Sequence, residues 1–242
     1  MRIQTILFDL DGTLLPMDQE LFVKTYFKLL VGKLMPLGYE KESLIQTIMA
    51  GVEAMVKNDG STTNEKVFWK VFEERLGTEA LKHRPLIDEF YQTDFNQASF
   101  TCPRNEKVAG YIEQVKNMGF RLVLATNPIF PRAATQNRIR WAGLKPEDFE
   151  LYTTYENSSF CKPNPKYYEE ILDKIGCSPK ECLMVGNDVT EDMVAETLGM
   201  EVFLHKDCLI NQEEKDISKY PQGGFAEFMD YLRKREEENV RK

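Results

Sequence analysis

From residue 101 onward this chain alternates between short apolar runs typical of strands and longer segments with helical periodicity. Turn-forming residues separate each run from the next helical segment. The predicted strands are 121–125, 151–154, 182–185 and 201–204, and the predicted helices are 106–118, 131–143, 164–176 and a last one that ends near Gly199. Because strands that alternate with helices form parallel sheets with right-handed crossovers, this pattern predicts an α/β fold.

The apolar run at residues 3–8 is a further strand, and we expect it to join the same sheet. Residues from about 18 to 98 contain only helical patterns, in about four amphipathic segments, so they interrupt the α/β pattern. We therefore predict a Rossmann-like core at residues 1–15 and 101–242, with helices on both faces of its parallel sheet. Residues 16–100 are predicted to form an inserted, all-helical domain.

Two capping patterns predict where individual helices begin. Thr62 and Glu65 match a capping box before the third helical segment of the insertion. Asn164 followed by Pro165 is typical of an N-cap and a first helical position. We therefore expect one helix to start directly after Thr62 and another directly after Asn164.

The composition narrows the possible partners and compartments. The 242 residues include 31 Lys and Arg and 39 Asp and Glu, a net charge of −8, so we expect no binding to nucleic acid or to a membrane surface. The sequence has no apolar run of transmembrane length and no signal-peptide pattern. Its five cysteines form no CxxC pair and it has only two histidines. We therefore expect a cytoplasmic protein with reduced thiols, without a zinc site or a His-based triad.

The first strand ends abruptly in two carboxylates, Asp9 and Asp11, which are followed by Gly12 and Thr13. Burying carboxylates at the end of a core strand is unfavourable unless positive charge lies close to them. A metal or a ligand at the carboxyl edge of a parallel sheet would supply that charge. These residues taken alone also fit an ordinary Asp-Gly turn.

Polar side chains follow three later segments in the same way. Thr126 and Asn127 follow the second strand, Lys162 lies after the weak strand at 151–154, and Asp188 and Asp192 follow the fourth strand. Taken singly, these residues fit a turn, a solvated lysine and acids at a helix N-terminus. Because the carboxyl ends of parallel strands meet at one edge, their recurrence favours a single shared site.

The residue types at these strand ends indicate phosphoryl chemistry. Several carboxylates in one cleft would repel one another without a divalent cation, and oxygen ligands without His or Cys indicate Mg²⁺. Thr126, Lys162 and the backbone N–H groups around residues 10–13 could bind a phosphoryl group. Asp9 could attack phosphorus to form an aspartyl-phosphate, and Asp11 could act as general acid and base.

These four segments resemble the four ordered motifs of the haloacid dehalogenase-like (HAD) hydrolase superfamily, and the resemblance covers essentially the whole chain. The matching segments are 9–13, 126–127, 162–163 and 186–192. The resemblance implies that the helical insertion is a C1-type cap, which closes over the site and selects the substrate. It also implies that Asp9 is the nucleophile and Asp11 the general acid and base.

The same resemblance implies which residues bind the phosphate and the metal. Catalytic contacts to the phosphate are implied for Thr126 and Lys162, and substrate binding also for Gly12, Thr13 and Asn127. Mg²⁺ is implied to be held by Asp9, the backbone carbonyl of Asp11 and Asp188, with Asp192 either bound to it directly or just outside its ligands.

Two departures from the family pattern bear on function. Asn187 stands between Gly186 and Asp188, where many members have Gly-Asp directly, although the spacing from Asp188 to Asp192 is normal. The namesake dehalogenases generally lack the second acid of the first motif, so Asp11 argues against cleavage of a carbon–halogen bond. We therefore predict a Mg²⁺-dependent phosphatase acting on a small-molecule phosphate ester. The alternatives are a phosphotransferase such as a sugar-phosphate mutase, and a non-catalytic binding protein on the same fold.

Overall fold

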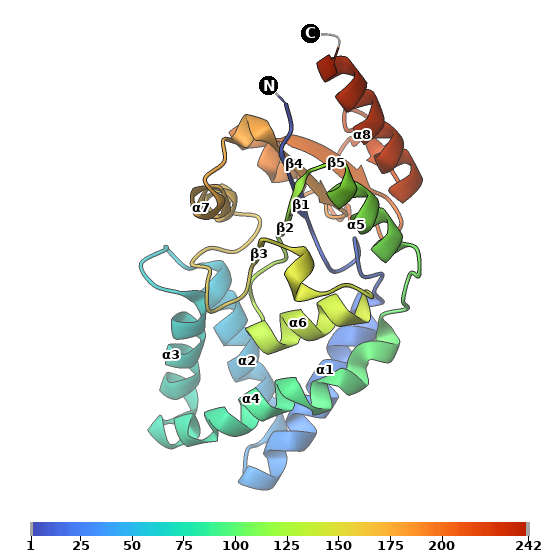
Figure 1. Cartoon of the computed structure of the whole chain (residues 1–242). Coiled ribbons are helices and arrows are strands. Elements are labelled where there is room, and N and C mark those ends of the chain that lie inside the picture. Colours follow the sequence, from blue (N-terminus) through green and yellow to red (C-terminus); the bar gives the residue numbers. More distant parts are fainter. Residues whose placement is uncertain (1, 241–242) are drawn as a thin grey trace.

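The computed structural model describes residues 2–240, and its centre is a six-stranded sheet in which every pair of neighbouring strands is parallel (Figure 1). The strand order is β3-β2-β1-β4-β5-β6. The strands are β1 (Thr5–Phe8), β2 (Arg121–Leu124), β3 (Leu151–Tyr152), β4 (Cys182–Gly186), β5 (Glu201–His205) and β6 (Gln222–Gly223). The predicted α/β class, with a Rossmann-like parallel sheet, is confirmed.

Helices cover both faces of this sheet, as predicted. They are α5 (Val108–Asn117), α6 (Arg132–Trp141), α7 (Pro165–Ile175) and α8 (Phe225–Val240). Side chains of β1 alternate between the two faces: Phe8 packs in one core cluster with residues of α5 and α8, whereas Leu7 packs in another with residues of α7. The strand is therefore buried from both sides, which explains its continuous apolar pattern.

The register of the central strands brings distant parts of the chain to one edge. Phe8 of β1 lies level with Leu124 of β2 and with Val185 of β4. The chain beyond these positions therefore reaches one edge of the sheet from three segments that lie 61 to 177 positions apart in the sequence. This register is what assembles the site described below.

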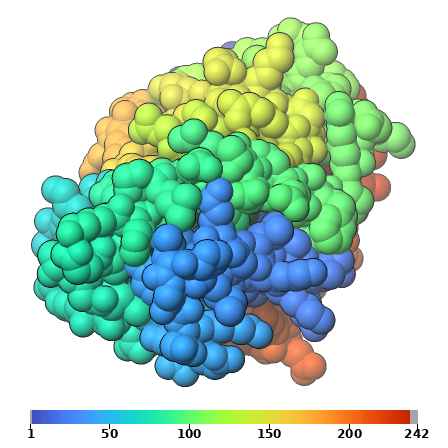
Figure 2. Space-filling view, turned by 90° about the horizontal axis from the view of Figure 1, so that it is seen from below, coloured from blue at the N-terminus to red at the C-terminus, as the bar shows by residue number. Residues whose placement is uncertain are grey.

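The segment between β1 and α5 is helical and lies below the sheet in Figure 1. It contains α1 (Gln19–Leu34), α2 (Lys41–Val56), α3 (Asn64–Leu76) and α4 (Arg84–Gln92), with shorter 3₁₀ turns between them. Figure 2, seen from below, shows these helices in blue to green across this side of the molecule. The helical content fits the predicted cap, whereas its boundaries at residues 16 and 100 stay a prediction. No described helix is both long and apolar enough to cross a membrane.

The capping predictions had opposite outcomes. The side chain of Asn164 accepts a hydrogen bond from the backbone N–H of Lys166 at the start of α7, as predicted. The capping box at Thr62 is wrong, because the N-cap of α3 is Thr63 and its side chain makes no capping hydrogen bond. Glu65, which would have completed the box, instead forms an ion pair with Arg84.

Two other elements differ from the sequence-based expectation. The last predicted helix before Gly199 is a 3₁₀ helix, Met193–Leu198. Strand β6 was not predicted at all, because its two residues, Gln222 and Gly223, have neither the length nor the β-branched or aromatic side chains typical of a strand.

Candidate active site

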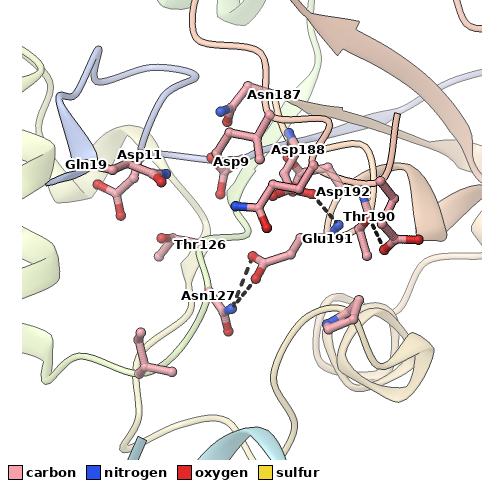
Figure 3. Close-up of a pocket in the computed structure, with 15 residues that line it drawn as sticks. Asp9, Asp11, Gln19, Thr126, Asn127, Asn187, Asp188, Thr190, Glu191 and Asp192 are labelled. Atoms are coloured by element: carbon pink, nitrogen blue, oxygen red, sulfur yellow. Dashed lines mark hydrogen bonds between the residues drawn. The ribbon is translucent and has the colours of Figure 1, made fainter. Parts of the chain in front are cut away.

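The loops that follow β1, β2 and β4 border one pocket of about 420 Å³ at the carboxyl edge of the sheet (Figure 3). Of the side chains predicted for the site, those that line it are Asp9, Asp11, Thr126, Asn127, Asp188 and Asp192. Lys162 does not line the pocket, but its ammonium contacts two of these acids. Gly12 and Thr13 are not among the described residues that line the pocket.

Lys162 is buried between two carboxylates, with only 1% of its surface exposed. Its Nζ donates to Asp9 Oδ1 at 2.8 Å and to Asp192 Oδ1 at 2.6 Å. Burial by itself disfavours the charged ammonium, but the charges of Asp192 and Asp9 outweigh it and hold the pKa of Lys162 well above its usual range. Lys162 is therefore a permanent positive charge beside Asp9.

Asp192 organises the loop after β4 rather than facing the pocket with a free oxygen. While its Oδ1 accepts from Lys162, its Oδ2 accepts from the backbone N–H of Asp188 at 2.9 Å. A Cβ atom at Gly186 would lie 2.1 Å from Asp192 Oδ2, so only glycine allows this close approach. Burial raises the pKa of Asp192, and the Lys162 ammonium opposes that rise.

Asp188 keeps one carboxylate oxygen available. Its Oδ1 accepts from the backbone N–H groups of Thr190 at 2.7 Å and Glu191 at 2.8 Å, in a tight turn. Its Oδ2 takes part in no hydrogen bond among the described residues. The same is true of Asp9 Oδ2, because the Asp9 side chain is engaged only through Oδ1.

Asn187 joins three loops, which gives a physical reason for its departure from the family pattern. Its Oδ1 accepts from the Thr13 hydroxyl at 2.9 Å, and its Nδ2 donates to the carbonyl of Cys208 at 2.7 Å. Gly12 has a φ of +89°, and a Cβ there would lie 2.4 Å from Asn187 Nδ2. Gly12 and Thr13 thus contact the loop after β4, and their predicted contact with substrate stays a prediction.

Asp11 is held by an arginine of α6 that the sequence analysis did not single out. Arg138 is 1% exposed, and its Nη1 donates to Asp11 Oδ2. The guanidinium also lies 4.6 Å from the centre of the Phe130 ring. Burial raises the pKa of Asp11, and the charge of Arg138 opposes the rise. Asp11 Oδ1 is buried without a hydrogen-bond partner, so one oxygen of the predicted general acid is uncommitted.

Glu191 is a further carboxylate in the pocket. Asn127 Nδ2 lies 3.2 Å from each of its two carboxylate oxygens (Figure 3). Burial raises the pKa of Glu191 to about 7, against the opposing charge of Lys162. The Asn127 amide is therefore committed to Glu191, and its Oδ1 is buried without a partner.

The oxygen atoms of the pocket suit a magnesium ion. Within residues 2–240, no three His, Cys, Asp or Glu side chains form a cluster ready to hold a metal. Of the acids predicted to hold the metal through a side chain, Asp188 keeps Oδ2 available and the Asp9 carboxylate accepts only the hydrogen bond from Lys162, whereas Asp192 uses both of its oxygens. Mg²⁺ is commonly bound by one or two carboxylates and completes its octahedron with water and phosphate oxygens, so the donor set fits.

A family model for the haloacid dehalogenase-like hydrolases matches residues 3–195. The chain belongs to this family. It is therefore a hydrolase, and the predicted resemblance is confirmed. The match spans β1, the helical segment, and the loops after β2 and β4, so all of the site residues predicted from the sequence lie within it.

Related proteins and structures agree with this assignment. The pyrophosphatase PpaX of Bacillus cereus (strain AH820) is 24% identical over 188 residues, which cover 78% of this chain and 76% of PpaX. A HAD phosphatase of Thermococcus onnurineus has a TM-score of 0.58 and 18% identity, and covers 95% of this chain and 98% of its own. The HAD-hydrolase YfnB of Bacillus subtilis, described as bound to magnesium, has a TM-score of 0.57 and 20% identity, covering 96% and 100%. At these identities the structures show a shared fold.

The sequence analysis missed two residues of this HAD hydrolase's site, Arg138 and Glu191, and only Arg138 could have been found from the sequence pattern. Arg138 shares one face of its helix with the buried residues Ala134 and Ala142, four positions to either side. An arginine on an apolar helix face would have indicated a buried charge with a partner. Glu191 lies inside the matched segment 186–192, but nothing in the sequence distinguishes it from a solvated acid.

Proposed function

We propose that the chain is a Mg²⁺-dependent phosphatase that hydrolyses a small-molecule phosphomonoester through an aspartyl-phosphate on Asp9. The observation that carries the proposal is the convergence of three groups at one pocket. Asp9 offers a free oxygen, the buried Lys162 places a positive charge beside it, and Thr126 lines the same pocket. A nucleophile next to donors for the phosphoryl oxygens is the arrangement that phosphoryl transfer requires.

The first half of the reaction forms the covalent intermediate. Asp9 Oδ2 attacks phosphorus, and the bond from phosphorus to the leaving oxygen breaks. Lys162 orients Asp9 through Oδ1 and compensates negative charge, while the Thr126 hydroxyl donates to a phosphoryl oxygen. Asp11 lines the pocket, where Arg138 holds its carboxyl group, and gives a proton to the leaving oxygen.

The second half returns the enzyme to its starting state. Asp11, now a carboxylate, takes a proton from water, whose oxygen attacks phosphorus and releases inorganic phosphate from Asp9. Asp9, through the carboxylate oxygen that does not attack phosphorus, the carbonyl oxygen of Asp11 and Asp188 would hold Mg²⁺, which would supply positive charge near the phosphoryl oxygens. Asp192 acts indirectly, because it orients the Lys162 ammonium and the backbone of Asp188.

An organic monoester fits the pocket better than pyrophosphate, the substrate class in the name of PpaX. Pyrophosphate would place a second phosphate where the leaving group lies, and that group needs additional cations. No Lys or Arg is among the described residues that line the pocket, and the neighbouring Lys162 is committed to Asp9 and Asp192. All five cysteines are unpaired, which supports a reducing, cytoplasmic setting.

The proposal is tested by release of inorganic phosphate from a panel of phosphomonoesters, with and without Mg²⁺. We expect one phosphate per ester consumed, which also separates hydrolysis from transfer to a second alcohol. Absence of phosphate release across the panel, or unchanged release after Mg²⁺ is chelated, would overturn it.

A further inference from the structure

A second, apolar pocket lies directly beside the catalytic pocket. Its volume is about 240 Å³, and it is formed by α1 to α4 and by the loop after β2. Ile129 lines both pockets. On α1, Gln19 lines the catalytic pocket, whereas Phe22 and Val23, one turn further on, line the apolar one. The two pockets therefore adjoin along both the loop and the helix.

The apolar pocket offers almost nothing to a polar ligand. Its walls are mostly aromatic, and the ring centres of Tyr26 and Phe130 lie 5.5 Å apart. The polar atoms of these walls pair with one another: the Tyr26 and Tyr91 hydroxyls are 2.7 Å apart. Since the exposed rim is lined by hydrocarbon and the polar groups are already satisfied, binding here is favourable only for an apolar group.

The position of this pocket matches that of a leaving group. Phe130 forms part of its wall and stacks on Arg138, and Arg138 holds Asp11, the residue that protonates the leaving oxygen. The catalytic pocket itself is lined by carboxylates such as Asp188 and Glu213 and would repel an anionic leaving group. An alcohol released next to Asp11 therefore lies between the apolar pocket and the carboxylates of the catalytic pocket, which favours an uncharged, apolar alcohol.

We infer that the substrate is the phosphomonoester of an apolar alcohol, whose hydrocarbon part occupies the pocket between Phe22, Met49, Trp69 and Phe130. This inference rests on the proposed phosphatase function. The volume is below the roughly 300–1,000 Å³ of sites for drug-sized ligands, so the group is about one ring in size.

Two esters of matched shape test the inference. Cyclohexylmethyl phosphate and glucose 6-phosphate both carry the phosphate on a CH₂ group attached to a saturated six-membered ring, but only the sugar ring is polar. We expect kcat/KM, measured by phosphate release with Mg²⁺, to be at least about tenfold higher for the cyclohexylmethyl ester, the usual scale of discrimination by an apolar pocket. An equal or higher value for glucose 6-phosphate would overturn the inference.

Two methionine variants test whether the preference for the cyclohexylmethyl ester arises in the apolar pocket. Met49 lines the apolar pocket and is 52% exposed, whereas Met35 is 50% exposed and lies outside its lining. Met49→Glu should lower kcat/KM for cyclohexylmethyl phosphate about tenfold or more and leave acetyl phosphate, which has no ring to bind, unchanged. Met35→Glu should change neither. Equal effects of the two variants, or an equal loss on both substrates, would contradict the assignment.

Acetyl phosphate also separates this inference from the proposed function. Hydrolysis of acetyl phosphate without preference for the cyclohexylmethyl ester would refute the inference alone. If no phosphate is released from any ester, the phosphatase proposal fails. Calorimetry with the non-hydrolysable cyclohexylmethylphosphonate then measures whether the apolar pocket binds a ring. Binding that Met49→Glu weakens supports an apolar site, and binding that is absent or unaffected by Met49→Glu overturns it.

Discussion

Replacing Arg138 by methionine should expose how strongly the fold depends on one buried ion pair. The variant removes the guanidinium but keeps an unbranched apolar side chain of similar length on α6. It leaves the Asp11 carboxylate without its cation, and Asp11 Oδ1 already has no partner. Breaking a buried pair from one side typically costs about 3–5 kcal/mol. Because the Asp11 side chain keeps 23% of its surface exposed, we expect the lower end, about 3 kcal/mol of unfolding free energy.

The loss of stability should depend on pH in a defined direction. Burial raises the pKa of Asp11 and Arg138 opposes the rise, so removing Arg138 raises the folded-state pKa further. Below its pKa the Asp11 carboxyl group is protonated and uncharged, so the loss of the Arg138 charge then costs little stability. The destabilisation is therefore largest above that pKa and shrinks as the pH falls through it. The difference between Arg138→Met and wild type should therefore be smaller at about pH 5 than at about pH 8.

Urea unfolding of four proteins at both pH values provides the measurement. Arg140→Met is the matched control, because Arg140 lies on the same helix but is exposed, and we expect a change within about 0.5 kcal/mol. The double variant Asp11→Asn with Arg138→Met should be more stable than Arg138→Met alone, since the unpaired charge is gone. Equal stability of Arg138→Met and Arg140→Met, or a loss that does not change with pH, would refute the reasoning.

Three further substitutions test the catalytic assignments. Asp9→Asn should abolish phosphate release while the urea midpoint stays near that of wild type, because Lys162 keeps Asp192 as a partner; near-normal turnover would exclude Asp9 as nucleophile. Asp11→Asn should reduce kcat more for alkyl than for activated aryl phosphates, which need less protonation, and equal losses would argue against a general acid. Asn187→Ala removes one buried and one partly buried hydrogen bond and should lower the free energy of unfolding by about 1–3 kcal/mol in urea; an unchanged midpoint would contradict this expectation.

The sequence predicted the sheet and the position of the site for the same physical reason. Strands buried on both faces leave continuous apolar runs, and parallel strands end at one edge, so polar residues after β1, β2 and β4 had to converge. Asp9, Thr126 and Asp188 could therefore be placed together from the order of strands and turns alone.

What the sequence could not predict depends on contacts between distant segments. The partner of Asp11 is Arg138, on a helix whose orientation follows from packing against the rest of the fold. The first N–H groups of α3 need no local cap, because Asn64 donates to the carbonyl of Ser158 and Glu65 to the carbonyl of Tyr155. Strand β6 forms only because β5 offers it an edge.

The place of β1 in the sheet has a consequence for synthesis on the ribosome. This strand is made first, but its two neighbours, β2 and β4, begin at Arg121 and Cys182. At translation rates of about 5–20 residues per second, β1 waits about 10–35 s for its second neighbour. The helices between them emerge meanwhile, and their apolar faces are the first surfaces with which the nascent strand can associate. Chaperone dependence should therefore concentrate on β1.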